Sequence, residues 1–286
     1  MRNRSHGTSR HRGWRRVFNG VNLATLLVFL FIVTPLYWMI TAAFKTPSNV
    51  EVSPPQYFPH PLSVANFTDA FSHYSFGRYI VNSAVVAVVS TALVLVLGTL
   101  AGYAMGRLPM RGRFTVLVVL LMISVFPEIA VVVPLYALLR DIGWLNSYQA
   151  LIIPYTAFFL PFAIWILRNY FMAVPREMEE SARIDGASPL RTIWSVVLPQ
   201  TLPGLFTAGV FTFTACWTEF LMALSFNVSD SYRTIPVGVA LFGGQFITSY
   251  GDIFAASVVA VVPIAILVFI FRRNVVSGLT AGAVKG

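Results

Sequence analysis

The segment 175–199, PREMEESARIDGASPLRTIWSVVLP, is polar and charged, although long apolar runs flank it on both sides. A segment of this composition cannot lie in lipid, because its charged groups would lose their hydration there. It must therefore form a loop that faces water between two apolar segments. Its internal order of helix, glycine break and helix is the design of a docking surface for another protein.

The composition of the remaining chain is that of an integral membrane protein. Of its 286 residues, 57% are hydrophobic and 11% are charged, and the mean hydropathy is +0.73. A membrane-spanning helix needs about 20 apolar residues to cross roughly 30 Å of hydrocarbon. The sequence predicts an all-α membrane protein of one domain, 1–286, with six spans at 21–44, 79–104, 114–138, 150–167, 202–226 and 253–271.

The basic residues predict the orientation of these spans. Sixteen of the twenty lie before the first span or after the second, fourth and sixth, and the opposite side holds Lys45, Arg78, Arg140 and Arg233. Because cytoplasmic loops carry the excess of Lys and Arg, we expect three cytoplasmic segments: the basic tail 1–17, the loop 175–199 and the C-terminal tail 274–286. The net charge of +9 follows from this topology and does not indicate a nucleic-acid partner.

The polar loop carries signals for the start and end of its first helix. Pro175 suits a first helical turn, where its missing N–H is not needed. Glu177, Glu179 and Glu180 follow, and their charges favour the positive end of the helix dipole. Gly186 tolerates the left-handed conformation that ends a helix. The sequence therefore predicts a first helix that stops at Gly186.

A second helix is expected after this break. Ser188 can cap it, with Pro189 in its first position. The pair Leu198-Pro199 is expected to end it. An apolar stripe for packing against the membrane-side core falls at helical spacing, at Leu190, Ile193, Trp194 and Val197.

Several residues within the spans have more than one interpretation. Gly98, Gly102 and Gly106 recur every four residues, which suits close helix packing but also the general enrichment of glycine in membrane helices. Glu128 and Glu219 are the carboxylates deep within predicted spans, so each is a candidate for a transport pathway or a contact between helices. Alternatively, Glu128 follows a helix break at Pro127, and Glu219 reaches water near the outer end of its span.

The spacing of the polar loop resembles that of a known family. Glu180-Ser181-Ala182, three residues, Gly186, nine residues and then Val196-Val197-Leu198-Pro199 are similar to the EAA loop of ATP-binding-cassette (ABC) importer permeases. Ser181 and Val196 depart from the usual alanine and isoleucine. Trp217-Thr218-Glu219-Phe220 and the C-terminal segment 277–286 further resemble the carbohydrate-uptake, or maltose-type, members, with Thr218 in place of an asparagine.

This resemblance implies a type I ABC importer membrane domain and a set of functional residues. The coupling helix would dock on a partner ATPase, with Glu180 in an ion pair, and the C-terminal tail would reach the ATPases. An outer loop would enter the binding protein, and a pathway would run between the spans. The implied residues are Met178, Glu180, Ser181, Ala182, Asp185, Gly186 and Ala187 for coupling; Leu279, Thr280, Gly282 and Lys285 for the tail; Gly243, Gly244, Gln245 and Phe246 for the outer loop; and Glu128, Trp217, Thr218 and Glu219 for the pathway.

The same resemblance implies the partners. These are a second homologous permease, two ATPase subunits that use ATP and Mg²⁺, an extracytoplasmic sugar-binding protein and the lipid of a bacterial inner membrane. The chain lacks a phosphate-binding Gly-x-x-x-x-Gly-Lys-Ser/Thr motif, so it is not expected to be an enzyme or to hold a cofactor. With Cys216 as its one cysteine and no paired ligand motif, no metal site is expected either.

Two other function classes fit the sequence less well. A transporter or channel working alone would show internal repeats or an intramembrane charge route. A membrane enzyme would place histidines in the spans, yet His6, His11, His60 and His73 lie outside them. Within the importer class, the alternative to a sugar is glycerol 3-phosphate or another small polar solute. An anionic solute would favour basic residues at span centres, where the sequence has none.

Overall fold

The computed structural model describes residues 20–243 and 249–281, which fold into helices joined by turns. Four helices are long and apolar enough to cross a membrane: α1 (Gly20–Ala43), α3 (Phe76–Arg107), α6 (Gln149–Ala173) and α13 (Tyr250–Ala281). They confirm the first, second, fourth and sixth predicted spans.

The third predicted span is not one continuous helix. It divides into α4 (Arg113–Ser124) and α5 (Glu128–Asp141), which meet at 86°. With 12 residues, α4 is about 18 Å long, which is shorter than the hydrocarbon thickness. Pro127 stands at the bend, where it lacks the N–H that would continue the hydrogen-bond ladder. The break expected before Glu128 is therefore confirmed.

The fifth predicted span also ends early. Its long part is α10 (Leu202–Thr218), and a separate α11 (Leu221–Phe226) follows after a break at Glu219 and Phe220. The Glu219 carboxylate accepts bonds from the backbone N–H groups of Met222 and Ala223 at 2.7 and 3.1 Å. Glu219 thus satisfies donors at the start of α11, and this capping stabilises the break.

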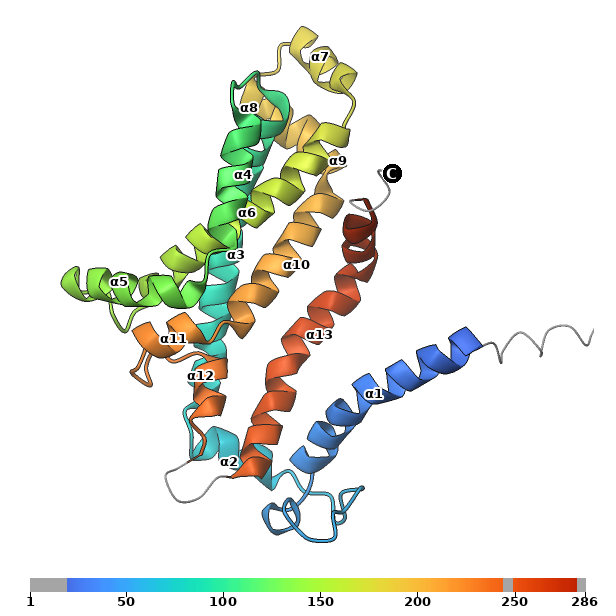
Figure 1. Cartoon of the computed structure of the whole chain (residues 1–286), viewed down its shortest axis with the longest axis vertical. Coiled ribbons are helices and arrows are strands. Elements are labelled where there is room, and N and C mark those ends of the chain that lie inside the picture. Colours follow the sequence, from blue (N-terminus) through green and yellow to red (C-terminus); the bar gives the residue numbers. More distant parts are fainter. Residues whose placement is uncertain (1–19, 244–248, 282–286) are drawn as a thin grey trace, which may run out of the picture.

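Short elements lie at both ends of the elongated molecule (Figure 1). One end, here the α7 end, carries α7 (Arg176–Ile184), α8 (Pro189–Thr192) and α9 (Leu198–Gln200). The opposite, α2 end carries α2 (Ala65–Ser72) and α12 (Ile235–Ala240). The arm before α2 also contains a short 3₁₀ turn at Pro47–Asn49. The extended arm and short helix predicted between the first two spans are confirmed.

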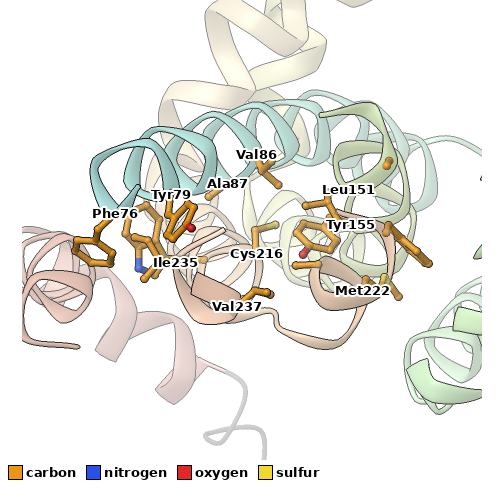
Figure 2. Packing of buried hydrophobic residues seen from close by; sticks show 14 of the residues in the cluster. Phe76, Tyr79, Val86, Ala87, Leu151, Tyr155, Cys216, Met222, Ile235 and Val237 are labelled. Atoms are coloured by element: carbon orange, nitrogen blue, oxygen red, sulfur yellow. The ribbon is translucent and has the colours of Figure 1, made fainter. Parts of the chain in front are cut away.

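The central helix α3 packs against α6 and α10, and α1 packs on α13. Gly98, Gly102 and Gly106 face α6: a Cβ atom on Gly102 would lie 3.1 Å from the backbone nitrogen of Arg168. The packing interpretation of the glycine stripe is confirmed. Toward the α2 end, a core cluster joins Phe76 of α3, Tyr155 of α6 and Met222 of α11 (Figure 2). Both bent spans, α4–α5 and α10–α11, are therefore anchored on the packed helices α3 and α6.

Candidate functional site

The two helices of the polar loop form an elbow around Gly186. This elbow, residues 175–199, turns at a φ of +80° at Gly186, a left-handed conformation that side chains disfavour. The N–H of Gly186 donates to the carbonyl of Arg183, and the N–H of Ala187 donates to that of Ala182. These bonds satisfy carbonyls left free at the end of α7. The glycine break is confirmed.

The second half of the elbow begins as expected but does not stop at Pro199. The Ser188 hydroxyl accepts a bond from the Arg191 N–H at 3.4 Å, and Pro189 follows the cap. A π-helical turn at Ile193–Val197 then precedes α9, which contains Pro199 and runs to Gln200. The second helix therefore ends at Gln200, one residue beyond the expected ending at Leu198-Pro199.

The predicted apolar stripe of this second helix is only half buried. Ile193 and Val197 are buried, and they pack in a cluster with residues of α3, α6 and α10. Leu190 and Trp194 instead expose 60% and 50% of their surface. The π-helical turn changes the rotation per residue, so the 3.6-residue period does not continue through it. The elbow therefore presents large apolar side chains that its own chain does not cover.

Glu179 anchors the elbow to the membrane helices, a role that the sequence interpretation missed. Its side chain is 5% exposed and lies against that of Arg107, with 2.8 Å between Nε and Oε1. The Arg107 N–H does not point at that oxygen, so this contact is an ion pair without hydrogen-bond geometry. The Tyr103 hydroxyl donates to the other carboxylate oxygen at 2.9 Å. Arg183 lies 3.8 Å from it. One buried charge cluster thus joins α7 to the end of α3.

A signal for Glu179 was available in the helical spacing. Glu179 and Ala182 are three residues apart and both are buried, and the partly buried Met178 packs on the same core. The outward residues of α7 and the turn are Glu180, Ser181, Asp185 and Gly186, together with Ile184, which is 87% exposed. Ala187 is half-buried. The sequence motif includes the exposed Glu180 but not its buried neighbour Glu179.

Glu128 and Glu219, which the sequence treats alike, have different surroundings. Glu219 is buried, and the Tyr155 hydroxyl of α6 donates to the same carboxylate that caps α11. Of the alternatives, a contact between helices is thus the one that fits Glu219, because its burial leaves little access to water. Glu128 is half-buried and faces a cavity of about 540 Å³. Aromatic side chains of α6 line this cavity: Phe158, Phe159, Phe162 and Trp165.

Trp217 and Thr218 also differ from each other in burial and in hydrogen-bond partners. The indole N–H of Trp217 donates to the carbonyl of Ala260 in α13 at 3.0 Å, and its side chain is buried. Thr218 is exposed, and its hydroxyl donates to the carbonyl of Thr214. Trp217 therefore ties α10 to α13, whereas Thr218 keeps an accessible surface.

Comparisons with known proteins agree with this arrangement. The family described as binding-protein-dependent transport system inner membrane component matches residues 94–280. The chain belongs to this family. It is an ABC importer permease, a class of non-catalytic membrane subunits that rely on partner ATPases for ATP hydrolysis. The family resemblance inferred from the polar loop is thereby confirmed.

The permease is similar to named relatives along nearly its whole length. It is 40% identical over 277 residues to the sulfoquinovosyl glycerol transport system permease protein SmoH of Agrobacterium fabrum, covering 96% of this chain and 97% of that protein. It is 36% identical to the trehalose/maltose transport system permease protein MalG of Thermococcus litoralis, covering 92% and 95%. Its fold matches a bacterial ABC transporter involved in the import of alginate, with a TM-score of 0.78, 20% identity and coverage of 94% and 99%.

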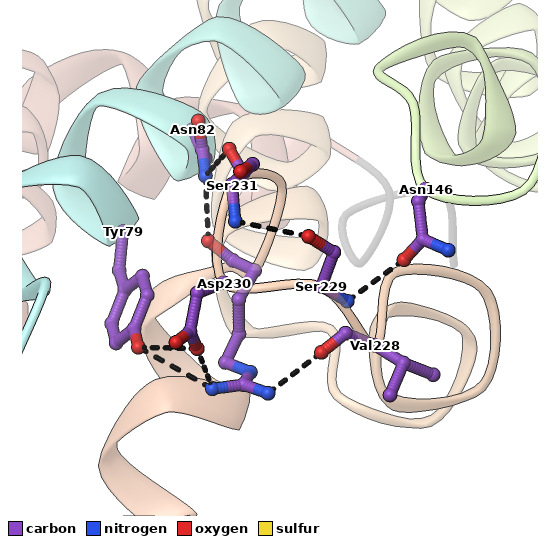
Figure 3. A network of polar contacts seen from close by, with 8 residues as sticks. Tyr79, Asn82, Asn146, Val228, Ser229, Asp230 and Ser231 are labelled. Atoms are coloured by element: carbon purple, nitrogen blue, oxygen red, sulfur yellow. Dashed lines mark hydrogen bonds and ion pairs between the residues drawn. The ribbon is translucent and has the colours of Figure 1, made fainter.

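A second polar connector of the permease lies toward the α2 end. This connector, residues 227–234, follows α11 and is bonded to two other parts of the chain, α3 and the turn before α6 (Figure 3). Asp230 forms an ion pair with Arg233 and accepts a bond from the Tyr79 hydroxyl at 3.0 Å. The Asn82 amide donates to two connector carbonyls, and Asn146 accepts a bond from a connector N–H at 2.8 Å. The connector is thus fixed by its own chain.

The remaining predicted residues of the permease lie at the edges of the described structure. Gly243 is exposed, whereas Gly244, Gln245 and Phe246 of the outer loop lie outside the described residues. Leu279 and Thr280 fall within α13, at the α7 end, and Gly282 and Lys285 also lie outside the described residues.

Proposed function

We propose that this permease moves a sugar or oligosaccharide across the bacterial inner membrane by alternating access, after delivery by an extracytoplasmic binding protein. The main support is its identity of 40% and 36%, over nearly the full length, with permeases of sulfoquinovosyl glycerol and trehalose/maltose transport systems. The proposed complex contains a second homologous permease and two ATPase subunits, which use ATP and Mg²⁺.

The α7 end is proposed to face the cytoplasm. The ends of α3 and α13, the start of α4 and the whole elbow lie at this end. The basic residues of these segments are the ones that the positive-inside rule assigns to the cytoplasm. The binding protein would then approach from the α2 end, where Gly243, Gly244, Gln245 and Phe246 are proposed to enter its sugar cleft.

The elbow is proposed to receive force from an ATPase. Glu180, Ser181, Asp185 and Gly186 are exposed, so they can contact a partner directly. Met178 and Ala182 pack toward the permease, so their contribution would be to hold α7 in place, with Ala187 at the turn. Ile184, Leu190 and Trp194 supply the exposed apolar area that protein interfaces bury. The tail residues Leu279, Thr280, Gly282 and Lys285 are proposed to reach the same ATPases.

The cavity beside Glu128 is the proposed part of the pathway in this chain. Half of its lining residues are aromatic and one carries a carboxylate, a composition typical of sites that bind small organic ligands. A carboxylate accepts hydrogen bonds from sugar hydroxyls. Thr218 is kept as a second pathway candidate because it is exposed, while Trp217 and Glu219 support the helices around the route.

The test is to reconstitute the permease with its partner subunits and measure both sugar uptake and ATP hydrolysis stimulated by the loaded binding protein. We expect Glu180→Ala and Gly186→Pro to reduce both. We expect Glu128→Gln to lower sugar uptake while leaving assembly of the complex intact. Unchanged stimulation in both elbow variants would contradict the coupling role. Uptake of glycerol 3-phosphate in place of every sugar would contradict the proposed substrate class.

A further inference from the structure

A cavity of about 400 Å³ lies between α7 and the ends of α3 and α4, separate from the cavity beside Glu128. Four arginines and two glutamates line it: Arg107, Arg113, Arg176, Arg183, Glu179 and Glu180. Leu108 and Pro109 complete its wall. Four positive and two negative charges leave a local excess of two positive charges, so the cavity favours an anion.

The charges in this cavity are not all neutralised by one another. Arg107 is paired with Glu179 at 2.8 Å, and Arg183 lies 3.8 Å from the same carboxylate. Within the described part of the chain, neither Arg113 nor Arg176 has an ion-pair or side-chain hydrogen-bond partner. Both are exposed. Two guanidinium groups are therefore available, and their planar arrays of N–H donors suit the oxygens of a phosphate group.

The level of the cavity in the membrane identifies the kind of anion. Arg107 is the last residue of α3, and Arg113 is the first residue of α4, so both mark the place where a membrane helix meets water. Apolar side chains lie exposed beside them: Leu108 is 46%, Met110 38% and Phe114 72% exposed. A free phosphate or an acidic side chain of an ATPase would use the arginines alone. A phospholipid would use the arginines for its phosphate and the apolar side chains for its acyl chains.

We propose that this cavity binds the phosphate of an anionic phospholipid headgroup. Basic cavities at the cytoplasmic ends of membrane helices bind such headgroups, since each interfacial arginine favours the anionic lipid. Because Arg176 and Arg183 belong to α7, a bound lipid would connect the elbow with the membrane surface. Binding would then hold α7 against the ends of α3 and α4, next to the Glu179–Arg107 pair.

The experiment compares lipid binding to the complete, delipidated importer in detergent, by native mass spectrometry and by titration with phosphatidylglycerol or phosphatidylcholine. We expect phosphatidylglycerol to be preferred and the double variant Arg113→Gln/Arg176→Gln to weaken its binding about thirtyfold, the combined effect of two interfacial arginines. Arg191→Gln is the matched control, because Arg191 is exposed in the same loop but does not line the cavity. Its binding should stay within about twofold of the unmodified importer.

Three results would overturn the proposal. Equal phosphatidylglycerol binding by the double variant and the unmodified importer would place the lipid elsewhere. Inorganic phosphate that binds the importer as tightly as phosphatidylglycerol would make the cavity a site for a soluble anion. Loss of the ATPase subunits from the double variant, with lipid binding retained, would make these arginines an ATPase contact. Both substituted arginines are exposed, so the variant is expected to fold.

Discussion

The two polar connectors of this permease differ in what holds them. The connector near the α2 end, residues 227–234, is bonded to α3 and to the turn before α6 through both side chains and backbone. The elbow, residues 175–199, is fastened by the buried Glu179 cluster and by Ile193 and Val197, while Ile184, Leu190 and Trp194 stay exposed. A connector that its own chain satisfies is a fixed part of the structure. A connector with uncovered apolar side chains is suited to a partner.

The largest effect is expected from Gly186→Pro in the elbow. Proline fixes φ near −65°, which is incompatible with the +80° at Gly186. The turn between α7 and α8 must then reorganise, and we expect sugar uptake and stimulated ATP hydrolysis to fall more than tenfold, an estimate based on displacement of a docked element. Uptake and ATP hydrolysis by the reconstituted importer are the measurements.

Gly143→Pro is the matched control for this prediction. Gly143 has a φ of +71°, and a Cβ atom there would meet nothing within 4 Å, as at Gly186. It lies in the turn between α5 and α6, far from the elbow in sequence. We expect Gly143→Pro to lower stability but to keep the stimulation of ATP hydrolysis per folded complex. Similar loss of stimulation in both variants would mean that backbone strain alone accounts for the effect.

Glu179→Gln should have the next largest effect. It leaves the Arg107 guanidinium, whose side chain is 6% exposed, without its counter-charge. Breaking a buried ion pair by removing one partner costs about 3 to 5 kcal/mol. We expect a lower free energy of unfolding and weaker coupling between ATP hydrolysis and uptake. Thermal unfolding in detergent and the uptake assay measure these two effects. A variant as stable as the unmodified permease would show that Glu179 does not anchor the elbow.

Glu219→Gln tests what holds the start of the connector 227–234 in place. Glu219 caps α11, which leads into the connector, and it accepts a bond from Tyr155. An amide can accept fewer bonds than a carboxylate, so a buried donor is left unpaired at a cost of about 1 to 3 kcal/mol. We expect reduced thermal stability with coupling preserved. Glu128→Gln, which changes no contact of this kind, should leave stability unaltered.

Asp230→Asn should have the smallest effect, although Asp230 is also in an ion pair. Its side chain is 61% exposed, compared with 5% for Glu179. Exposed ion pairs contribute about 0 to 1 kcal/mol. The free energy of unfolding should therefore change by less than about 1 kcal/mol, measured in the same thermal assay as Glu179→Gln. A loss as large as that of Glu179→Gln would remove the difference between the two connectors.

The sequence predicts the elements of this fold better than their contacts. Local chemistry decides the Gly186 turn, the Ser188 cap and the break at Pro127, so these are visible in short segments. The π-helical turn before Pro199 is not, because it depends on how Ile193 and Val197 pack against distant helices. The Glu179–Arg107 pair joins residues that are 72 positions apart in the sequence, so only tertiary structure brings them together.

The two intramembrane carboxylates illustrate the same limit. Both follow a helix and both have polar or aromatic neighbours in sequence. Their environments separate only when α6 places Tyr155 against Glu219 and its aromatic face beside Glu128. Burial and partners, which belong to the packed state, decide whether such a group supports the structure or faces a cavity.

The most direct test of the account is site-specific cross-linking from the two connectors in the assembled importer. Cys216, the one native cysteine, is buried and can be replaced by alanine. Ile184→Cys and Val228→Cys then place a thiol at positions that are 87% and 61% exposed. The account predicts that Ile184→Cys cross-links to an ATPase subunit and that Val228→Cys does not. Absence of an ATPase cross-link at 184 in an importer that hydrolyses ATP, or its presence at 228, would contradict it.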